Sequence, residues 1–426
     1  MKSHYYTIIP ITVVASLLFG WCHKNEPAKT GNVNSSVTND ARPIAPARLP
    51  VQSGTEVTFY PTYGYRAGSD WKMHLRGWAH ENRMHANRFV TAVAEIKNKC
   101  SEAEMSIFQS RSDDFEDDDN SLEKVVIKFD SDPEDKPYQF GGRSNPNGIV
   151  ELVLSLSDDK AKQLLDKQGS SNGWLTYRAV SGGHTGLGRV RLIEPEGESL
   201  ISDIDDTIKV TEVPAGKDTV LRNTFCLEFK AAPDMAKTYN DLSNTPIHYV
   251  SGGPEQLFGP LYDYLITGAG GFPEGTFHLN FFPKNLISQI TRSRLKRFAA
   301  RKLKLERFAT SSLDDTFDHK ISKITELMDR FPNRKFILVG DSGEVDPEVY
   351  NEIRRQRGNQ VKEIRIRDVI NDNDANANPY RLQGMQVIKV DQVVCMSEEH
   401  FKNLSAKLEQ IYQREYRRNT APPCNR

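Results

Sequence analysis

The stretch "SLISDIDDTIKVTEV", Ser199 to Val213, decides the fold of this chain. A short apolar run ends here in three closely spaced carboxylates, Asp203, Asp205 and Asp206. Negative charges this close repel one another, so keeping all three ionised costs free energy unless a cation balances them. The stretch therefore indicates a cation site at the end of a buried strand.

Two later apolar runs end in a similar way. "PIHYVSGG" ends in Ser251 and Gly252, and "KFILVGD" ends in Asp341. Helical stretches such as "PEQLFGPLYDYLI" and "KISKITELMDRF" alternate with these runs. Such alternation is typical of buried parallel strands in a doubly wound α/β domain, in which ligands bind beyond the carboxyl ends of the strands. We therefore expect the polar side chains to meet at one edge of a parallel sheet.

The spacing DxDxT separates two chemical roles. Asp203 can attack phosphorus and bind a metal, provided that a divalent cation, for which Mg²⁺ is suited, offsets the repulsion between carboxylate and phosphate. Asp205 can protonate the leaving oxygen, activate water afterwards and add a metal ligand, while Thr207 would hold the loop and the phosphate. A calcium-binding EF-hand is excluded because its glycine and glutamate positions hold Ile208 and Pro214, and a solvated acidic turn remains the alternative.

The other two strand ends supply complementary groups. The hydroxyl of Ser251 and the backbone at Gly252 form a candidate phosphate cradle before a helix start. Asp341 and Asp346, five residues apart, are candidate metal ligands, and Glu344 between them is a lesser candidate. Each motif taken singly also fits an ordinary strand-to-helix turn, so the argument depends on their occurring together.

A fourth element has to balance the charge of the transferring phosphoryl group. Lys320 in "FDHKISKI" is the first choice, and Lys284 in "FFPKN" is the competitor. These four elements, in this order, resemble the haloacid dehalogenase superfamily of phosphohydrolases. Together with "GFPEGTFHL" they look like the catalytic domain of the Mg²⁺-dependent phosphatidate phosphatase family of the actin-patch-associated type. The resemblance implies a Rossmannoid parallel sheet with Asp203 as nucleophile, Asp205 as acid and base, Thr207, Ser251, Gly252 and Lys320 as phosphate contacts, and Asp203, Asp205, Asp341 and Asp346 around Mg²⁺.

The rest of the chain divides by composition. Strand candidates rich in aromatic and branched residues, including "TEVTFYPTYGYR" and "GIVELVLSL", precede the first motif and predict a mostly β domain, with one helix near residues 87–99. The predicted organisation is a signal at 1–22, a flexible linker at 23–51, the β domain at 52–195, the haloacid dehalogenase-like domain at 196–380 and a strand and helix extension at 381–426.

The N-terminus predicts export. Lys2 is followed by a mostly apolar run without charge up to Trp21 and then by a polar stretch. Cys22 stands where a bacterial lipoprotein carries its acylated cysteine, although Trp21 occupies a position that normally requires a small residue. We therefore expect a periplasmic protein or one anchored through Cys22. Disulfides or buried free thiols are both open for the remaining cysteines, Cys100, Cys226, Cys395 and Cys424.

Charge gives little indication of partners. The 426 residues include 56 Lys and Arg against 57 Asp and Glu, so no overall field points to nucleic acid. One local segment, "TRSRLKRFAARKLKLERF" at 291–308, could bind an anionic membrane surface, although a solvated helix that packs its apolar edge on the core is slightly favoured.

The resulting prediction is a Mg²⁺-dependent phosphatase with an aspartyl-phosphate intermediate. The resemblance implies phosphatidate as the substrate and diacylglycerol as the product. A phosphatase of soluble organic phosphates and a non-catalytic phosphate- or lipid-binding module are the alternatives.

Overall fold

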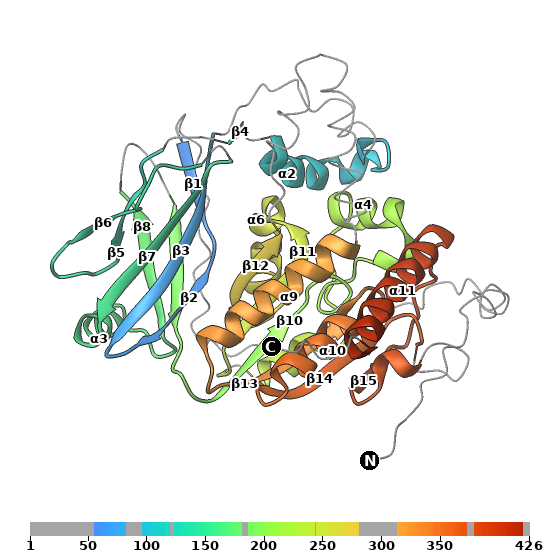
Figure 1. Ribbon diagram of the computed structural model, residues 1–426. Coiled ribbons are helices and arrows are strands. Elements are labelled where there is room, and N and C mark those ends of the chain that lie inside the picture. Colours follow the sequence, from blue (N-terminus) through green and yellow to red (C-terminus); the bar gives the residue numbers. More distant parts are fainter. Residues whose placement is uncertain are drawn as a thin grey trace.

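The computed structural model describes residues 55–81, 96–116, 118–119, 123–145, 147–180, 186–242, 244–280, 313–372 and 379–420, and structural statements here refer to these residues. Several predictions lie outside them, namely the signal, Cys22, the linker, most of the helix near 87–99, Lys284, the basic segment 291–308 and Cys424. Within the described part, a β-rich body and a larger α/β body lie side by side (Figure 1). No described helix has both the length and the apolar character needed to span a membrane.

The β-rich body confirms the prediction of a β-rich region before the first motif. Its sheet is antiparallel except where β2 and β9 run parallel. The path β1-β3-β2-β9-β8-β5-β6 is joined by β4 and β7, which both pair with the long strand β3. The strands are β1 (Thr55–Phe59), β2 (Thr62–Ala67), β3 (Asp70–Glu81), β4 (Asp118–Asp119), β5 (Val126–Phe129), β6 (Pro137–Gln139), β7 (Ile149–Ser157), β8 (Trp174–Ala179) and β9 (Leu187–Leu192).

One helix interrupts this body between β7 and β8. It is α3 (Asp158–Lys167), and it begins because the Ser157 hydroxyl accepts a hydrogen bond from the Lys160 amide, a standard N-cap. Ala161 and Leu164 turn into the core of the sheet. Closing the sheet with this helix buries apolar side chains such as Met73, Ile127 and Leu175 completely.

The α/β body contains a six-stranded parallel sheet in the order β12-β11-β10-β13-β14-β15. By position in the chain this order is 3-2-1-4-5-6, which is that of doubly wound domains. The mixed α/β class and the parallel sheet confirm the coarse prediction. The strands are β10 (Glu198–Ser202), β11 (Ile247–Pro254), β12 (Thr276–Asn280), β13 (Lys335–Asp341), β14 (Val361–Asp368) and β15 (Gln386–Lys389).

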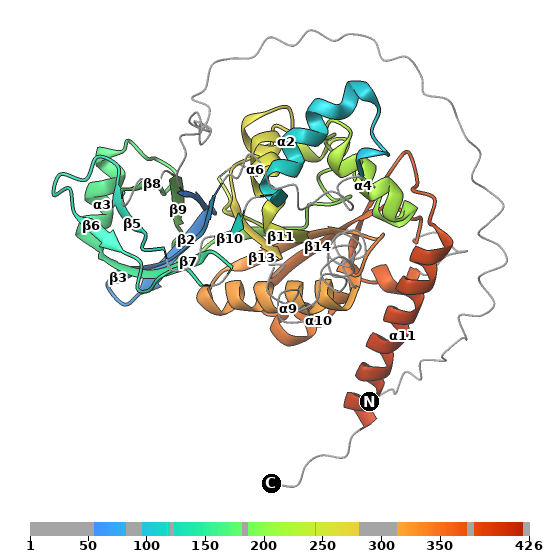
Figure 2. The same ribbon diagram turned by 90° about the horizontal axis from the view of Figure 1, so that it is seen from above.

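Helices cover both faces of this sheet, which explains the unbroken apolar runs (Figure 2). Leu200 of β10 points to one face and Ile201 to the other, and both are fully buried. The first face carries α2 (Met105–Glu116), α4 (Lys217–Phe225), α5 (Met235–Asn240) and α6 (Phe258–Tyr262), and the second carries α9 (Leu313–Arg330), α10 (Asp346–Arg357) and α11 (Glu398–Thr420). Short helical turns complete the body: η3 (Glu102–Glu104), η4 (Val213–Ala215), η5 (Glu255–Leu257), η6 (Asp263–Thr267) and η7 (Pro379–Leu382).

The two bodies pack firmly on each other. The ring of Tyr63 in β2 lies 5.5 Å from Phe331 and 6.1 Å from His248, measured between ring centroids. A disulfide joins Cys100 to Cys226, across 126 residues, and so fixes the segment before α2 to the end of α4. Cys395 is also disulfide-bonded. Disulfides, one of the two possibilities left open by the sequence, are thus present.

Candidate active site

The first and third motifs meet at the centre of the parallel sheet. Asp203 directly follows β10, and Asp341 is the last residue of the neighbouring strand β13. The next strand in the chain after β10 lies on its other side, so the strand order reverses between β10 and β13. Such a reversal opens a crevice beyond the carboxyl ends of the strands, which is where doubly wound domains bind ligands.

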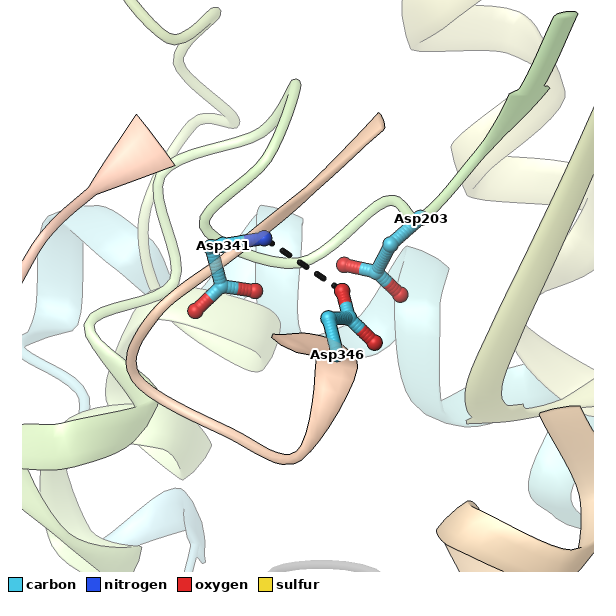
Figure 3. A group of neighbouring side chains, drawn as sticks. All are labelled: Asp203, Asp341 and Asp346. Atoms are coloured by element: carbon cyan, nitrogen blue, oxygen red, sulfur yellow. Dashed lines mark hydrogen bonds between the residues drawn. The ribbon is translucent and has the colours of Figure 1, made fainter. Parts of the chain in front are cut away.

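Three carboxylates converge at this point. Atoms of Asp203, Asp341 and Asp346 all lie within 4.8 Å of one another, and each side chain is almost completely buried (Figure 3). The first residue of α10 is Asp346, and its Oδ2 accepts a hydrogen bond of 3.3 Å from the Asp341 amide. Oδ2 of Asp341 is buried and has no hydrogen-bond partner among the residues that the structure describes. A buried oxygen without a partner in a group of oxygen ligands fits a hard divalent cation.

Lys320 from α9 lies among these carboxylates. Its Nζ is 2.7 Å from Asp203 Oδ1 and 2.5 Å from Asp346 Oδ1. Three carboxylates and one ammonium leave two negative charges, which is the charge that one divalent cation neutralises.

The pKa shifts have the direction expected for this burial. Burial raises the pKa values of Asp203 and Asp341 well above their usual range, and the neighbouring carboxylates raise them further. Burial alone would lower the pKa of Lys320, but Asp203 and Asp346 raise it well above its usual value. Lys320 therefore stays charged, and the raised pKa values of Asp203 and Asp341 favour protonation of these two carboxyl groups unless a cation occupies the group.

The other carboxylate of the first motif, Asp206, holds the loop. Its side chain accepts hydrogen bonds from the amides of Thr211, at 2.8 Å, and of Glu212 and Val213, both at 2.6 Å. The guanidinium of Arg367 donates to its backbone carbonyl. Asp206 has a φ of 54°, in the left-handed region that Asp adopts more readily than most residues. Asp206 thus fixes the chain that follows Asp203.

Thr207 contacts Asp203 within the first motif. Its hydroxyl donates a hydrogen bond of 3.1 Å to Asp203 Oδ2. Since Asp203 Oδ1 contacts Lys320, both oxygens of Asp203 have a protein partner and the carboxylate is held in one orientation.

Asp205 is placed differently from our expectation as a metal ligand. Its side chain is not part of the group of three, and its Oδ1 instead lies 2.7 Å from Lys209 Nζ and accepts a hydrogen bond of 2.6 Å from the Thr211 hydroxyl. Burial would raise the pKa of Asp205, but the charge and hydrogen bond of Lys209 lower it. Asp205 is the most exposed carboxylate of the motif, at 24% of its side chain, which suits a group that has to reach a substrate.

Ser251 and Gly252 lie in the carboxyl-terminal half of β11, on the other side of β10. The Ser251 hydroxyl accepts a hydrogen bond of 2.9 Å from the Gly253 amide. A Cβ atom on Gly252 would lie 2.8 Å from Thr316 Oγ1 of α9, and one on Gly253 would lie 3.7 Å from Asp205 Oδ2. This part of β11 therefore passes closely between α9 and Asp205, and a side chain at Gly252 would displace the strand from α9.

Lys209, Thr211 and Glu344 contribute more than the sequence indicated. The spacing of Lys209 four residues after Asp205 is a signal for an ion pair that could have been noticed. Glu344 lies near the carboxylates, and burial together with neighbouring Asp346 raises its pKa to about 7 although Lys320 opposes the shift. No local pattern indicates that Thr211 contacts Asp205.

Comparison with known proteins finds similarity in this part of the chain. The family model described as the catalytic domain of phosphatidate phosphatase APP1 matches residues 198–310 and 283–368. Residues 198–368 are therefore similar to this catalytic domain. Every residue placed above at the carboxylate group lies within the matched region.

Two yeast proteins are similar to the chain. Phosphatidate phosphatase APP1 of Saccharomyces cerevisiae is 34% identical over 180 residues, which cover 41% of this chain and 26% of that protein. An uncharacterized protein of Schizosaccharomyces pombe is 28% identical over 193 residues, covering 44% of this chain and 27% of that protein. The alignments thus span about a quarter of the length of these relatives.

Solved structures add no argument. A carbohydrate esterase aligns over 86% of this chain and 98% of that chain, but with 8% identity and a TM-score of 0.20. A TM-score this low does not indicate a shared fold. The resemblance to APP1 therefore rests on the sequence of residues 198–368.

Proposed function

We propose that this chain is a Mg²⁺-dependent phosphatase with a haloacid dehalogenase-like catalytic body and that it hydrolyses a phosphomonoester through an aspartyl phosphate. The observation that carries the proposal is the meeting of Asp203, Asp341 and Asp346 with Lys320 at the strand reversal. The similarity to yeast phosphatidate phosphatase APP1 favours phosphatidate as the substrate and diacylglycerol as the product.

The carboxylates would hold the metal and the phosphate together. Asp203, Asp341 and Asp346 would be its protein ligands, and Asp341 Oδ2 would gain the partner that it lacks. When bound, Mg²⁺ would neutralise the carboxylates and the phosphate oxygens and so reduce the repulsion that opposes attack. Lys320 would add a second positive charge beside Asp203, while Ser251 and the backbone of Gly252 would contact the phosphate oxygens.

The chemical steps require a nucleophile and a proton carrier. An oxygen of Asp203 forms a bond to phosphorus while the bond from phosphorus to the leaving oxygen breaks, and Asp205 gives that oxygen its proton. Asp205 then removes a proton from water, whose oxygen attacks the aspartyl phosphate, releasing inorganic phosphate and restoring Asp203. Because Lys209 keeps Asp205 ionised at rest, Asp205 has to leave this contact and take up a proton before the first step.

Phosphate release is the decisive measurement. The purified protein is given phosphatidate in mixed micelles, or a set of soluble phosphomonoesters, with Mg²⁺ or with a chelator. We expect Mg²⁺-dependent release from phosphatidate and none from the Asp203→Asn variant. The mechanism would be refuted if phosphate were released as fast in chelator as in Mg²⁺. An active Asp203→Asn variant would refute it as well.

The same assay separates the two alternatives. Faster turnover of soluble phosphomonoesters than of phosphatidate would favour a phosphatase of organic phosphates. Binding of phosphatidate vesicles by a parent protein without turnover would favour a binding module. The Asp205→Asn variant adds to this test, because a phosphatase loses turnover and keeps binding, whereas a binder is unchanged.

Export from the cytoplasm is part of the proposal. The disulfide between Cys100 and Cys226 supports it, because such bonds persist mainly in oxidising compartments. Cell fractionation with mass spectrometry of the mature N-terminus distinguishes cleavage from acylation of Cys22. A cytoplasmic protein that retains Met1 would refute export.

A further inference from the structure

The loop that joins Asp341 to Asp346 is contacted by residues that lie outside the region matched by the family model, 198–368. It connects β13 to α10 and carries two of the three carboxylates at its ends (Figure 3). Within the matched region, the Gly343 amide donates 2.7 Å to Asp341 Oδ1, and the amide and hydroxyl of Ser342 donate 2.9 Å each to the Arg367 carbonyl and to Asp368 Oδ1. Further side-chain donors to the backbone carbonyls of the loop come from groups beyond residue 368. These groups come from η7 and α11.

Arg381 of η7 makes the largest contribution. It is among the largest fully buried side chains, and its guanidinium donates 2.9 Å to the Ser342 carbonyl and 2.6 Å to the Glu344 carbonyl. The same group forms a bidentate pair with Glu348 in the first turn of α10, at 2.8 and 3.0 Å, and also contacts Asp372. One side chain thus fixes both the loop and the helix that presents Asp346.

His400 of α11 supplies the next contact. Its Nε2 lies 2.7 Å from the Gly343 carbonyl, so that the imidazole is placed to donate to it. The carbonyls of Ser342, Gly343 and Glu344 therefore each have a side-chain donor from the C-terminal segment. Three successive carbonyls bonded in this way leave the loop little freedom to move.

The start of α11 also contacts the loop after the first motif. The Ser397 amide donates 2.8 Å to the Pro214 carbonyl. A Cβ atom on Gly216 would lie 2.9 Å from Ser397 Oγ, so the two segments approach closely. The C-terminal segment therefore bridges the loops that follow Asp203 and Asp341, the two strand ends of the site.

We propose that Arg381 and His400 are positioning residues for the metal site: by fixing the backbone between Asp341 and Asp346 they set the affinity for the divalent cation. This inference rests on the proposed metal-dependent function. A cation needs its ligands at defined distances, and groups that orient metal ligands typically change affinity by roughly 10- to 100-fold when they are removed. The catalytic unit accordingly extends beyond the matched region to residue 400 at least.

A purely structural role for Arg381 is the rival explanation, and Arg334 provides the matched control. Arg334 is also buried, and it donates to the carbonyls of Glu194, Glu196 and Glu198 and to the Ser199 hydroxyl. It lies at the opposite, amino ends of β10 and β13, away from the carboxylates. Arg334→Lys therefore removes the same kind of contact without touching the metal loop.

The experiment measures Mg²⁺ binding to the purified protein by calorimetry, together with thermal unfolding of each variant in chelator. Arg381→Lys keeps the charge beside Glu348 but loses the planar fork that reaches two carbonyls. His400→Leu removes the donor to Gly343, and His400→Gln restores a donor of similar reach. We expect Arg381→Lys and His400→Leu to raise the Mg²⁺ dissociation constant tenfold or more, and His400→Gln and Arg334→Lys to change it less than threefold.

The outcomes separate the two proposals. Unchanged Mg²⁺ affinity in His400→Leu and in a folded Arg381→Lys would overturn the positioning role while leaving the metal site intact. Equal loss of affinity in Arg334→Lys and Arg381→Lys would also overturn it, because a general loss of stability would then explain both. Absence of Mg²⁺ binding in the parent would refute the metal-dependent function itself. If Arg381→Lys does not fold, the pair His400→Leu and His400→Gln decides.

Discussion

Replacing Lys320 with Met tests the charge balance on which the site depends. Methionine has nearly the shape of the lysine side chain and lacks the ammonium group. The Nζ atom lies 2.7 Å from Asp203 and 2.5 Å from Asp346, and all three side chains are at most 1% exposed. The variant therefore leaves buried carboxylates without their cation.

The expected loss of stability follows from these distances. With an effective dielectric constant of about 20, an ion pair of this length has a Coulomb energy of about 6 kcal/mol before desolvation is counted. Removing one partner of a buried pair costs about 3–5 kcal/mol, a large part of the roughly 5–15 kcal/mol that stabilises a typical domain. We expect Lys320→Met to lose about 3–5 kcal/mol of unfolding free energy at pH 7.5 in chelator.

The loss of unfolding free energy in Lys320→Met should become smaller as the pH falls. Burial already raises the pKa of Asp203 above its value in the unfolded chain. Such a group contributes stability at low pH that is lost as the pH rises through its folded pKa. Without Lys320 this folded pKa rises further. The deficit of the variant should therefore shrink as the pH is lowered from 7.5 towards 5.

Urea unfolding followed by circular dichroism measures this deficit. Lys323→Met is the matched control, because Lys323 lies three residues further along α9, is 38% exposed and pairs with the half-exposed Glu326. A surface pair of this kind contributes about 0–1 kcal/mol. A deficit for Lys320→Met within 1 kcal/mol of the control, or one that grows as the pH falls, would refute the reasoning. Phosphate release should fall about 100-fold or more for Lys320→Met and remain unchanged for the control.

Three further predictions concern other parts of the molecule. Burial lowers the pKa of His248 to about 3. The neutral imidazole therefore contributes stability above pH 6.5, and this contribution declines as the pH falls. Between pH 8 and pH 5 the unfolding free energy should fall by about 2 kcal/mol for this reason. His248→Asn should lose correspondingly less on acidification in urea unfolding, and an unchanged pH dependence would contradict this. Replacing Cys100 and Cys226 together with Ser should cost about 4–5 kcal/mol of unfolding free energy, because the disulfide closes a loop of more than 100 residues in the unfolded chain; an equal midpoint for parent and variant in urea would be inconsistent with the bond. Thr211→Val removes the hydrogen bond of 2.6 Å to Asp205 and the hydroxyl that accepts from Lys209 Nζ, while the ion pair between Asp205 and Lys209 remains. Phosphate release should fall about tenfold, and the unfolding free energy should fall by about 1–3 kcal/mol because buried polar groups lose a partner. Undiminished turnover would speak against this role.

The elements of the α/β body were largely predictable because their signals are local. A parallel strand covered on both faces has to be apolar throughout, and the runs that end at Asp203, Ser251 and Asp341 show this directly. The carboxyl ends of parallel strands share one edge, so the meeting of Asp203 with Asp341 follows from strand direction alone. The spacing between Asp341 and Asp346 places the second carboxylate at the start of a helix.

The partners of individual side chains were not predictable in the same way. Asp205 has the same chemistry as Asp203, and only the folded loop brings Lys209 and Thr211 to it and leaves it out of the carboxylate group. Nor does any local pattern choose between free and bonded cysteines. That choice depends on α2 lying against α4, which brings Cys100 to Cys226.

The amino-acid sequence by itself determined which side chains stand at strand ends, because hydrophobic burial and covalent spacing act over a few residues. Only the tertiary structure decided which carboxylates lie beside Lys320, which partners Asp205 takes, and that Arg381 and His400 hold the loop between Asp341 and Asp346. The physical reason is distance along the chain: a contact between residues 26 or more positions apart leaves no periodic signal, and its geometry exists only after the helices have packed on the sheet.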